Sequence, residues 1–191
     1  MATKGEKTRE SIIDASYALF AEKGFKQVTM KDVCEATNMS RGGLYSHFAG
    51  TDQLFEALLE KISENGTMDF QSEIKKGTSA ASILEKAFKI MEEEAKHPEG
   101  SLSIAIYEYA ETVNSDVMER LNKESKKKWK QLIRYGIENG EFKDTDVDGI
   151  VNTLLFSYQG IRMWSRIIPM NTKTIHSVLQ NIKRQLAGEQ I

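Results

Sequence analysis

The chain has 191 residues, of which 26 are basic and 28 acidic, so its formal net charge is -2. This length fits one large domain or two small ones and is short for most multidomain enzymes. Because the net charge is near zero, the surface is not basic overall. If the protein binds nucleic acid, it does so through a confined group of residues. One cysteine and three scattered histidines exclude an internal disulfide and give no metal-ligand spacing, so neither a metal nor another cofactor is expected.

The apolar residues are spread along the chain in helical patterns. No uncharged apolar run is long enough for a membrane span, and the polar start MATKGEKTRES lacks the apolar core of a signal peptide. These features favour a cytoplasmic protein that makes no membrane contact. The two prolines, Pro98 and Pro169, fall between stretches of helical periodicity. The predicted fold class is therefore all-α.

Three short helices are predicted at the front of the chain. The first covers about 8–24, with an apolar face that includes Phe20 and a capping glycine at Gly24. The second begins at Thr29, an N-cap with a carboxylate three residues later, and ends near residue 37. The third covers about 40–48, is capped by Ser40, and carries Leu44 and Phe48 on one side.

Longer helices are predicted behind them. A fourth covers about 51–62, and others cover 79–96, 116–139, 146–166 and 172–186. The apolar piece at 102–110 fits a helix or a strand by its periodicity, and its helical surroundings favour a helix. The total is about nine helices, arranged as a three-helix head and a larger helical body.

The tight turn between the second and third predicted helices is typical of a helix-turn-helix, whose second helix enters the DNA major groove. The first helix of such a unit offers backbone N–H groups to a phosphate, and Thr29 and Met30 are placed to do so. Arg41 is the side chain able to make a bidentate contact to guanine, and Gly42, followed by a second glycine, allows a close backbone approach. Tyr45 and His47 supply phosphate anchors one turn later.

Each of these residues also has an ordinary structural explanation. A pair of glycines weakens a helix and more often marks a loop. Tyr45 and His47 taken alone would more often be surface or half-buried residues. Cys34, on the apolar face of the second helix, fits core packing better than redox sensing. The DNA-binding prediction therefore depends on the combination within residues 29–47.

The segment FAEKGFKQVTMKDVCEATNMSRGGLYSHFAGTDQLFEALL resembles the DNA-binding head of the tetracycline-repressor (TetR) family. The resemblance covers about residues 8–60: a first helix ending in Gly-Phe, a second begun by threonine, and a recognition helix ending Leu-Tyr-x-x-Phe. It implies phosphate contacts from Thr29, Tyr45 and His47. It also implies base or groove contacts from Ser40, Arg41 and Gly42. Leu44 and Phe48 would belong to the core.

One position departs from the family pattern. The family usually places Ser-Lys before the acidic start of the fourth helix, with the lysine on a phosphate, whereas this chain has Gly50 and Thr51 there. The anchor is either lost or replaced by the Thr51 hydroxyl. Binding would then depend more on the basic residues Lys4, Lys7 and Arg9, expected ahead of the first helix.

The resemblance implies a DNA-binding domain over 1–50 and an effector-binding and dimerisation domain over 51–191. The apolar faces of 146–166 and 172–186 are wide enough to pair with a second copy as a four-helix bundle, so a homodimer through the last two helices is expected. A pocket for a small, largely apolar or aromatic effector is expected among apolar side chains of the body, although the same residues also fit plain core. The candidates are Phe88, Met91, Tyr109, Trp129, Phe156 and Gln159.

The preferred function is that of a bacterial transcriptional regulator, most simply a repressor that a small-molecule effector releases from a palindromic double-stranded DNA operator. An all-α enzyme or an interaction module built on the same helical body is the alternative. The sequence contains no GxSxG, HExxH, glycine-rich phosphate loop or CxxC motif, which disfavours an enzyme.

Overall fold

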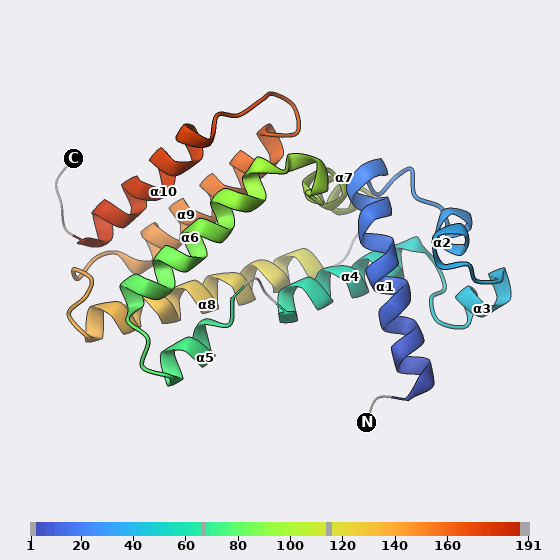
Figure 1. Cartoon of the computed structure of the whole chain (residues 1–191), viewed down its shortest axis with the longest axis horizontal. Coiled ribbons are helices and arrows are strands. Elements are labelled where there is room, and N and C mark those ends of the chain that lie inside the picture. Colours follow the sequence, from blue (N-terminus) through green and yellow to red (C-terminus); the bar gives the residue numbers. More distant parts are fainter. Residues whose placement is uncertain (1–2, 66–67, 114–115, 188–191) are drawn as a thin grey trace. The chain divides into compact units, whose positions relative to one another are not determined.

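The computed structural model describes residues 3–65, 68–113 and 116–187 and is all-helical within them, which confirms the predicted fold class (Figure 1). The described residues contain ten α-helices and one 3-10 turn. They are α1 (Lys4–Lys23), α2 (Met30–Thr37), α3 (Arg41–Tyr45), α4 (Thr51–Asn65), α5 (Phe70–Lys75), α6 (Ala80–Lys96), η1 (Pro98–Gly100), α7 (Ser103–Thr112), α8 (Val117–Glu138), α9 (Val147–Trp164) and α10 (Thr172–Ala187). None of these helices is long and apolar enough to cross a membrane.

The chain divides into two compact units. The first contains Met1–Glu64 and Glu99–Met118, and the second contains Asn65–Pro98 and Glu119–Ile191. The first unit is thus larger than a three-helix head, since it also includes α4 and α7.

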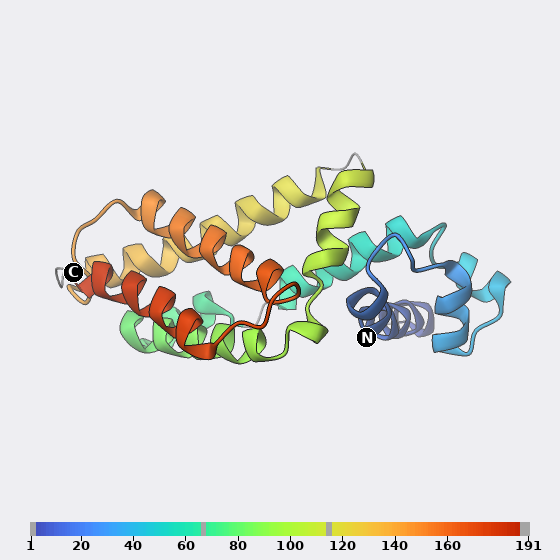
Figure 2. The same ribbon diagram turned by 90° about the horizontal axis from the view of Figure 1, so that it is seen from above.

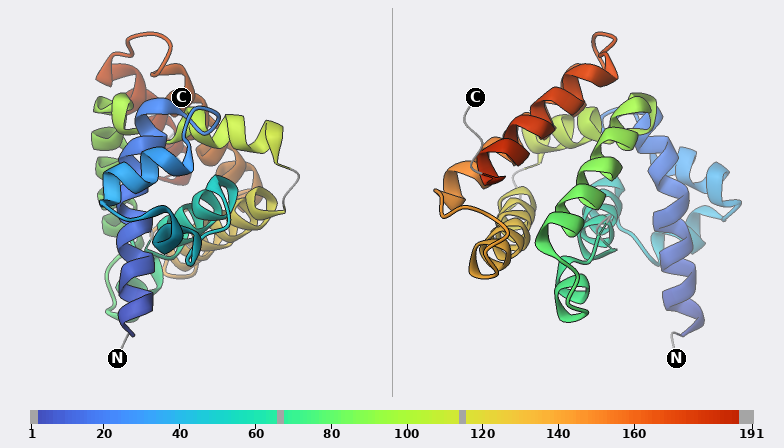
Figure 3. Two further views of the ribbon diagram at one scale, coloured as in Figure 1. Left: turned by 90° about the vertical axis from the view of Figure 1, so that its right-hand side faces the viewer. Right: turned by 60° about the vertical axis from the view of Figure 1, so that its left-hand side comes forward.

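The first unit is built around α1. Its inner face carries Ile12, Ile13 and Phe20, all nearly inaccessible to solvent, and α2 packs against this helix. The side of the unit that carries α2 and α3 faces the viewer in the left panel of Figure 3. Helix α3 contacts α2 and buries Leu44 completely, so apolar packing fixes the short α3.

Helix α7 belongs to the first unit although it follows α6 in the chain. It packs against α1, and the ring of fully buried Tyr109 lies 5.1 Å from Phe25 and 5.2 Å from Phe55. The Tyr109 hydroxyl donates a hydrogen bond to the Glu56 carboxylate on α4. Through this one residue α7 is joined to the α1–α2 turn and to α4.

The second unit is a bundle in which α6, α9 and α10 contact one another (Figure 2). Helix α8 completes its core with Leu132 and Ile133, which are buried together with residues of the other three helices. Periodic apolar residues on each helix create this core, as the spacing predicts. The short α5 contacts α6, and its first residue, Phe70, stacks edge-on against Trp129 with ring centroids 4.8 Å apart.

Most predicted helix ends agree with the structure. Gly24 caps α1 with a φ of 78°, and the side chains of Thr29, Ser79 and Asp146 accept the expected N-cap hydrogen bonds. The segment 103–112, for which a strand was also possible, is helical. Helix α5 was not predicted, and α3 ends at Tyr45 rather than near residue 48.

Candidate nucleic-acid interface

The turn between α2 and α3 is formed by Asn38. This residue closes α2 in the left-handed conformation with φ 52°, which asparagine tolerates better than most residues. The Met39 N–H then donates to the Cys34 carbonyl at 3.1 Å, which satisfies the end of the helix. The chain can therefore leave α2 and begin α3 at Ser40 within three residues, the compact connection that a helix-turn-helix requires.

Helix α3 exposes two of the side chains predicted to contact DNA, Arg41 and Tyr45. Ser40 caps it by accepting the Gly43 N–H at 3.2 Å, and Leu44 anchors it inward. Arg41 and Tyr45 are exposed and one turn apart, with the Arg41 guanidinium carbon 5.5 Å from the Tyr45 ring centroid. The aromatic ring holds the guanidinium beside the helix, where its donors remain available to a base edge or phosphate.

The two glycines of α3 have different surroundings. A Cβ on Gly42 would meet nothing within 4 Å, whereas one on Gly43 would lie 3.2 Å from the Ser40 Oγ. A methyl group at Gly42 would therefore point into open space, whereas one at Gly43 would press against the capping hydroxyl of Ser40. A close approach of the α3 backbone to DNA at Gly42 stays a prediction.

Thr29 is engaged in a reciprocal capping box with Asp32. Its N–H donates to Asp32 Oδ2 at 2.8 Å, and its hydroxyl accepts the Asp32 N–H at 3.2 Å. Lys23 approaches the same carboxylate at 2.6 Å and, together with Thr29, holds the pKa of Asp32 far below its usual range. The backbone donors left at the start of α2 are those of Met30 and Lys31, which precede the first intrahelical bond. The sequence showed the Thr29–Asp32 spacing, whereas the partnership with Lys23 depends on how α1 and α2 pack.

Three further basic or polar positions have defined places. His47 is half-buried in the turn after α3, and Thr51 is the first residue of α4 and partly exposed. Arg9 lies inside α1 with its guanidinium carbon 4.7 Å from the Phe48 ring centroid. The expectation that Lys4, Lys7 and Arg9 precede the first helix is wrong, because Thr3 caps α1 and the helix starts at Lys4.

The residues predicted to line an effector pocket do not gather in one place. Phe88 and Met91 are buried in the core of the second unit, and Trp129 packs on Phe70. Tyr109 belongs to the core of the first unit, while Phe156 is 63% exposed on α9. Gln159 is exposed as well.

Comparison with known proteins adds independent information. The family model for bacterial regulatory proteins of the tetR family matches residues 12–58, which span most of α1 to α4. The HTH-type transcriptional repressor KstR2 of Mycolicibacterium smegmatis is 26% identical over 146 residues, covering 73% of this chain and 70% of that protein. The uncharacterized HTH-type transcriptional regulator YfiR of Bacillus subtilis is 28% identical over 143 residues, covering 72% and 69%.

A solved structure shares the fold over the whole length. The TetR-family transcriptional regulator from Cytophaga hutchinsonii superposes with a TM-score of 0.80 at 20% identity, covering 100% of this chain and 98% of that one. The family match falls on the part of the chain that forms the helix-turn-helix, and the relatives extend into the helical body. Residues 12–58 thus form a DNA-binding head of the TetR family of transcriptional regulators, and the chain as a whole has the fold of a TetR-family regulator.

Proposed function

We propose that the protein is a ligand-responsive repressor that binds a palindromic operator as a homodimer and leaves it when a small effector binds. Regulators of this family bind DNA and act as dimers, and they are generally not enzymes. The observation that carries the DNA-binding assignment is the exposed row on α3, in which Arg41, Gly42 and Tyr45 lie over buried Leu44. As a regulator that binds bacterial DNA, the protein would act in the cytoplasm.

The DNA contacts are assigned by chemistry. Arg41 reads a guanine, and Ser40 and Gly42 lie at the groove. Tyr45 and His47 donate to phosphates, and at the start of α2 the contact is made by the Met30 N–H while Thr29 holds the helix end in place. Residues 1–50 carry these contacts, and residues 51–191 carry effector binding and dimerisation.

Dimerisation is assigned to the last two helices. Phe156 and Trp164 on α9 are 63% and 54% exposed, which is unusual for large apolar side chains and fits a covered interface. Two copies of α9 and α10 would form a four-helix bundle with twofold symmetry. The recognition helices must then lie about 34–36 Å apart to enter successive major grooves.

The proposal is tested by selecting bound fragments from the source genome with the purified protein. We expect a short inverted repeat upstream of a gene, bound with an affinity that falls as salt rises. Purified, folded protein that shows no salt-dependent binding to any DNA would overturn the proposal. The genes beside the selected site would then direct the search for an effector.

A further inference from the structure

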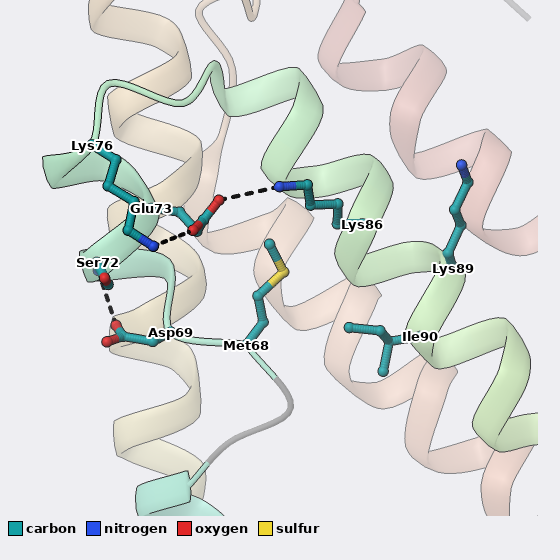
Figure 4. Close-up of a pocket in the computed structure, with 8 residues that line it drawn as sticks. All are labelled: Met68, Asp69, Ser72, Glu73, Lys76, Lys86, Lys89 and Ile90. Carbon is teal, nitrogen blue, oxygen red and sulfur yellow. Dashed lines mark hydrogen bonds and ion pairs between the residues drawn. The ribbon is translucent and has the colours of Figure 1, made fainter.

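A hollow of about 510 Å³ lies between α5 and α6 in the second unit (Figure 4). This is the size of pockets that hold small organic ligands. None of the candidate effector residues lines it. Its wall consists of Met68, Asp69, Ser72, Glu73, Lys76, Lys86, Lys89 and Ile90.

The polar part of the hollow is organised around one carboxylate. Glu73 accepts hydrogen bonds from Lys76 at 2.9 Å and from Lys86 at 3.2 Å, so two ammonium groups flank one anion (Figure 4). This pairing holds the pKa of Glu73 at about 2, so the carboxylate is charged at any physiological pH. Glu73 with its two lysines therefore carries a net positive charge.

Both lysines retain capacity for another anion. An ammonium group has three donors, and each of these two gives one to Glu73. Their side chains are 65% and 54% exposed, so a ligand can reach them. Lys89 adds a third positive charge at the edge of the hollow, and Asp69 adds a second negative charge. The Asp69 carboxylate also caps α5 by accepting a hydrogen bond from the Ser72 N–H.

The remaining wall is apolar. Figure 4 shows Met68 and Ile90 pointing into the space between α5 and α6, beside Lys86. A ligand that places an anionic group on the lysines would thus lay its next few carbons against a thioether and a branched alkyl chain. Methionine adapts its shape to such ligands because its side chain is flexible and polarizable.

We infer that the α5–α6 hollow binds an amphipathic anion, a carboxylate or phosphate monoester on a short hydrocarbon chain, held by Lys76 and Lys86 with Met68 and Ile90 beneath the chain. The inference rests on the proposed function, for which it names the chemical class of the effector. The site differs from the apolar or aromatic pocket expected from the sequence.

Calorimetric titration of the full chain without DNA tests the site directly. We expect octanoate to bind more tightly than acetate, by about four-fold for each methylene buried, and more tightly than neutral octanol. Octyl phosphate in a parallel titration shows which anionic head is preferred. Octanol binding as tightly as octanoate would overturn the inference.

Substitutions localise the binding. Lys86→Gln should weaken octanoate binding about ten-fold, because a charge-assisted hydrogen bond is lost. Lys75→Gln, on the exposed part of α5 outside the hollow, is the matched control and should leave binding unchanged. Equal affinities of the two variants, with unchanged circular dichroism, would exclude this site.

A change in the opposite direction separates electrostatics from structural damage. Glu73→Gln frees both lysines from their resident anion and should tighten octanoate binding, whereas general loosening of α5 would weaken it. A Glu73→Gln variant that binds octanoate no more tightly than the wild type would contradict the arrangement. Because these titrations contain no DNA, they fail or succeed independently of operator binding.

The regulatory role of the site has its own readout. Octanoate should lower the affinity of the wild type for the selected operator and have about ten-fold less effect on Lys86→Gln. Octanoate that binds in the hollow without changing operator affinity would overturn its role as an effector. An absence of operator binding at any octanoate concentration would instead overturn the proposed function.

Discussion

The Glu108 carboxylate on α7 accepts a hydrogen bond from the Lys26 backbone N–H at 2.9 Å. The neighbouring carboxylate of Glu111 reaches the Lys26 ammonium at 3.4 Å, so two acidic residues of α7 hold one turn of the first unit. This turn connects α1 to α2, and α2 begins only four residues after Lys26. Helix α7 therefore helps fix the start of α2, where the proposed phosphate contact lies.

Gly24→Ala should destabilise the first unit. Gly24 has φ 78° and ψ 177°, a region used almost only by glycine, and an added Cβ would lie 2.6 Å from Glu108 Oε2. The backbone strain alone costs about 1–3 kcal/mol. Urea unfolding measures the loss, and Gly100→Ala, where a Cβ meets nothing within 4 Å, is the control. Equal unfolding midpoints for the two variants would show that Gly24 is not strained.

Gly42→Ala should affect DNA binding and stability in opposite ways. A Cβ at this position meets nothing within 4 Å, and alanine is favoured over glycine in a helix by up to about 1 kcal/mol. Folding should therefore be unchanged or slightly more stable. Operator affinity, measured by fluorescence anisotropy, should fall because the methyl group occupies the space between α3 and the groove. Unchanged affinity would mean that α3 does not approach DNA through Gly42.

Arg41→Ala and Tyr45→Phe should differ in how they affect specificity. Losing a bidentate guanine contact costs roughly 1–3 kcal/mol on the cognate operator and little on unrelated DNA, so the ratio between them narrows. Removing the Tyr45 hydroxyl removes a phosphate contact and should weaken binding to both DNAs alike. Anisotropy titrations with the operator and a scrambled duplex give the four affinities. A parallel loss in both variants would remove Arg41 from base recognition.

Asp32→Asn should reduce stability at neutral pH and have no effect in strong acid. The hydrogen bond from Lys23, and then those from Thr29, lower the pKa of folded Asp32 below its unfolded value. A lowered pKa contributes stability above the unfolded pKa of about 3.9, and the contribution is lost as pH falls toward the folded value. The unfolding midpoints of the wild type and of Asp32→Asn should therefore begin to approach each other below about pH 4 and become equal only in strong acid. Glu35→Gln, which removes a carboxylate in an exposed ion pair on the same helix, should differ less from the wild type than Asp32→Asn does at neutral pH.

The sequence was informative where local chemistry decides the structure. Thr29 with Asp32, Ser40 and Gly24 were recognised as caps because capping depends on residues within one turn of each other. The burial of Leu44 was predicted correctly because Leu44 and Phe48 are four residues apart, on one side of a helix. The helix-turn-helix was therefore predictable from the sequence, while the DNA contacts of its individual residues stay a prediction.

Long-range packing was not accessible in this way. The membership of Tyr109 in the first unit depends on Phe25 and Phe55, which are far from it in sequence. Helix α5 has only six residues, too few for periodicity to stand out, and its lysine-lined hollow appears only when α6 packs beside it. The sequence could not separate aromatic side chains of the core from those that line a pocket, because both kinds of site are apolar.

Phe156→Glu should convert the protein from a dimer to a monomer. Phe156 and half-exposed Met163 are seven residues apart on α9 and therefore on one face, with 54% exposed Trp164 beside them. A glutamate there would bring a charge into the proposed interface, and pairing with Lys126, whose ammonium lies 5.5 Å from the Phe156 ring centroid, would not offset the cost of removing that charge from water. Sedimentation velocity reports the mass, and operator affinity should fall with it because a monomer contacts one half-site. Ile62→Glu, which changes a 41% exposed apolar residue on α4, should remain dimeric. A dimeric Phe156→Glu protein would place the interface elsewhere.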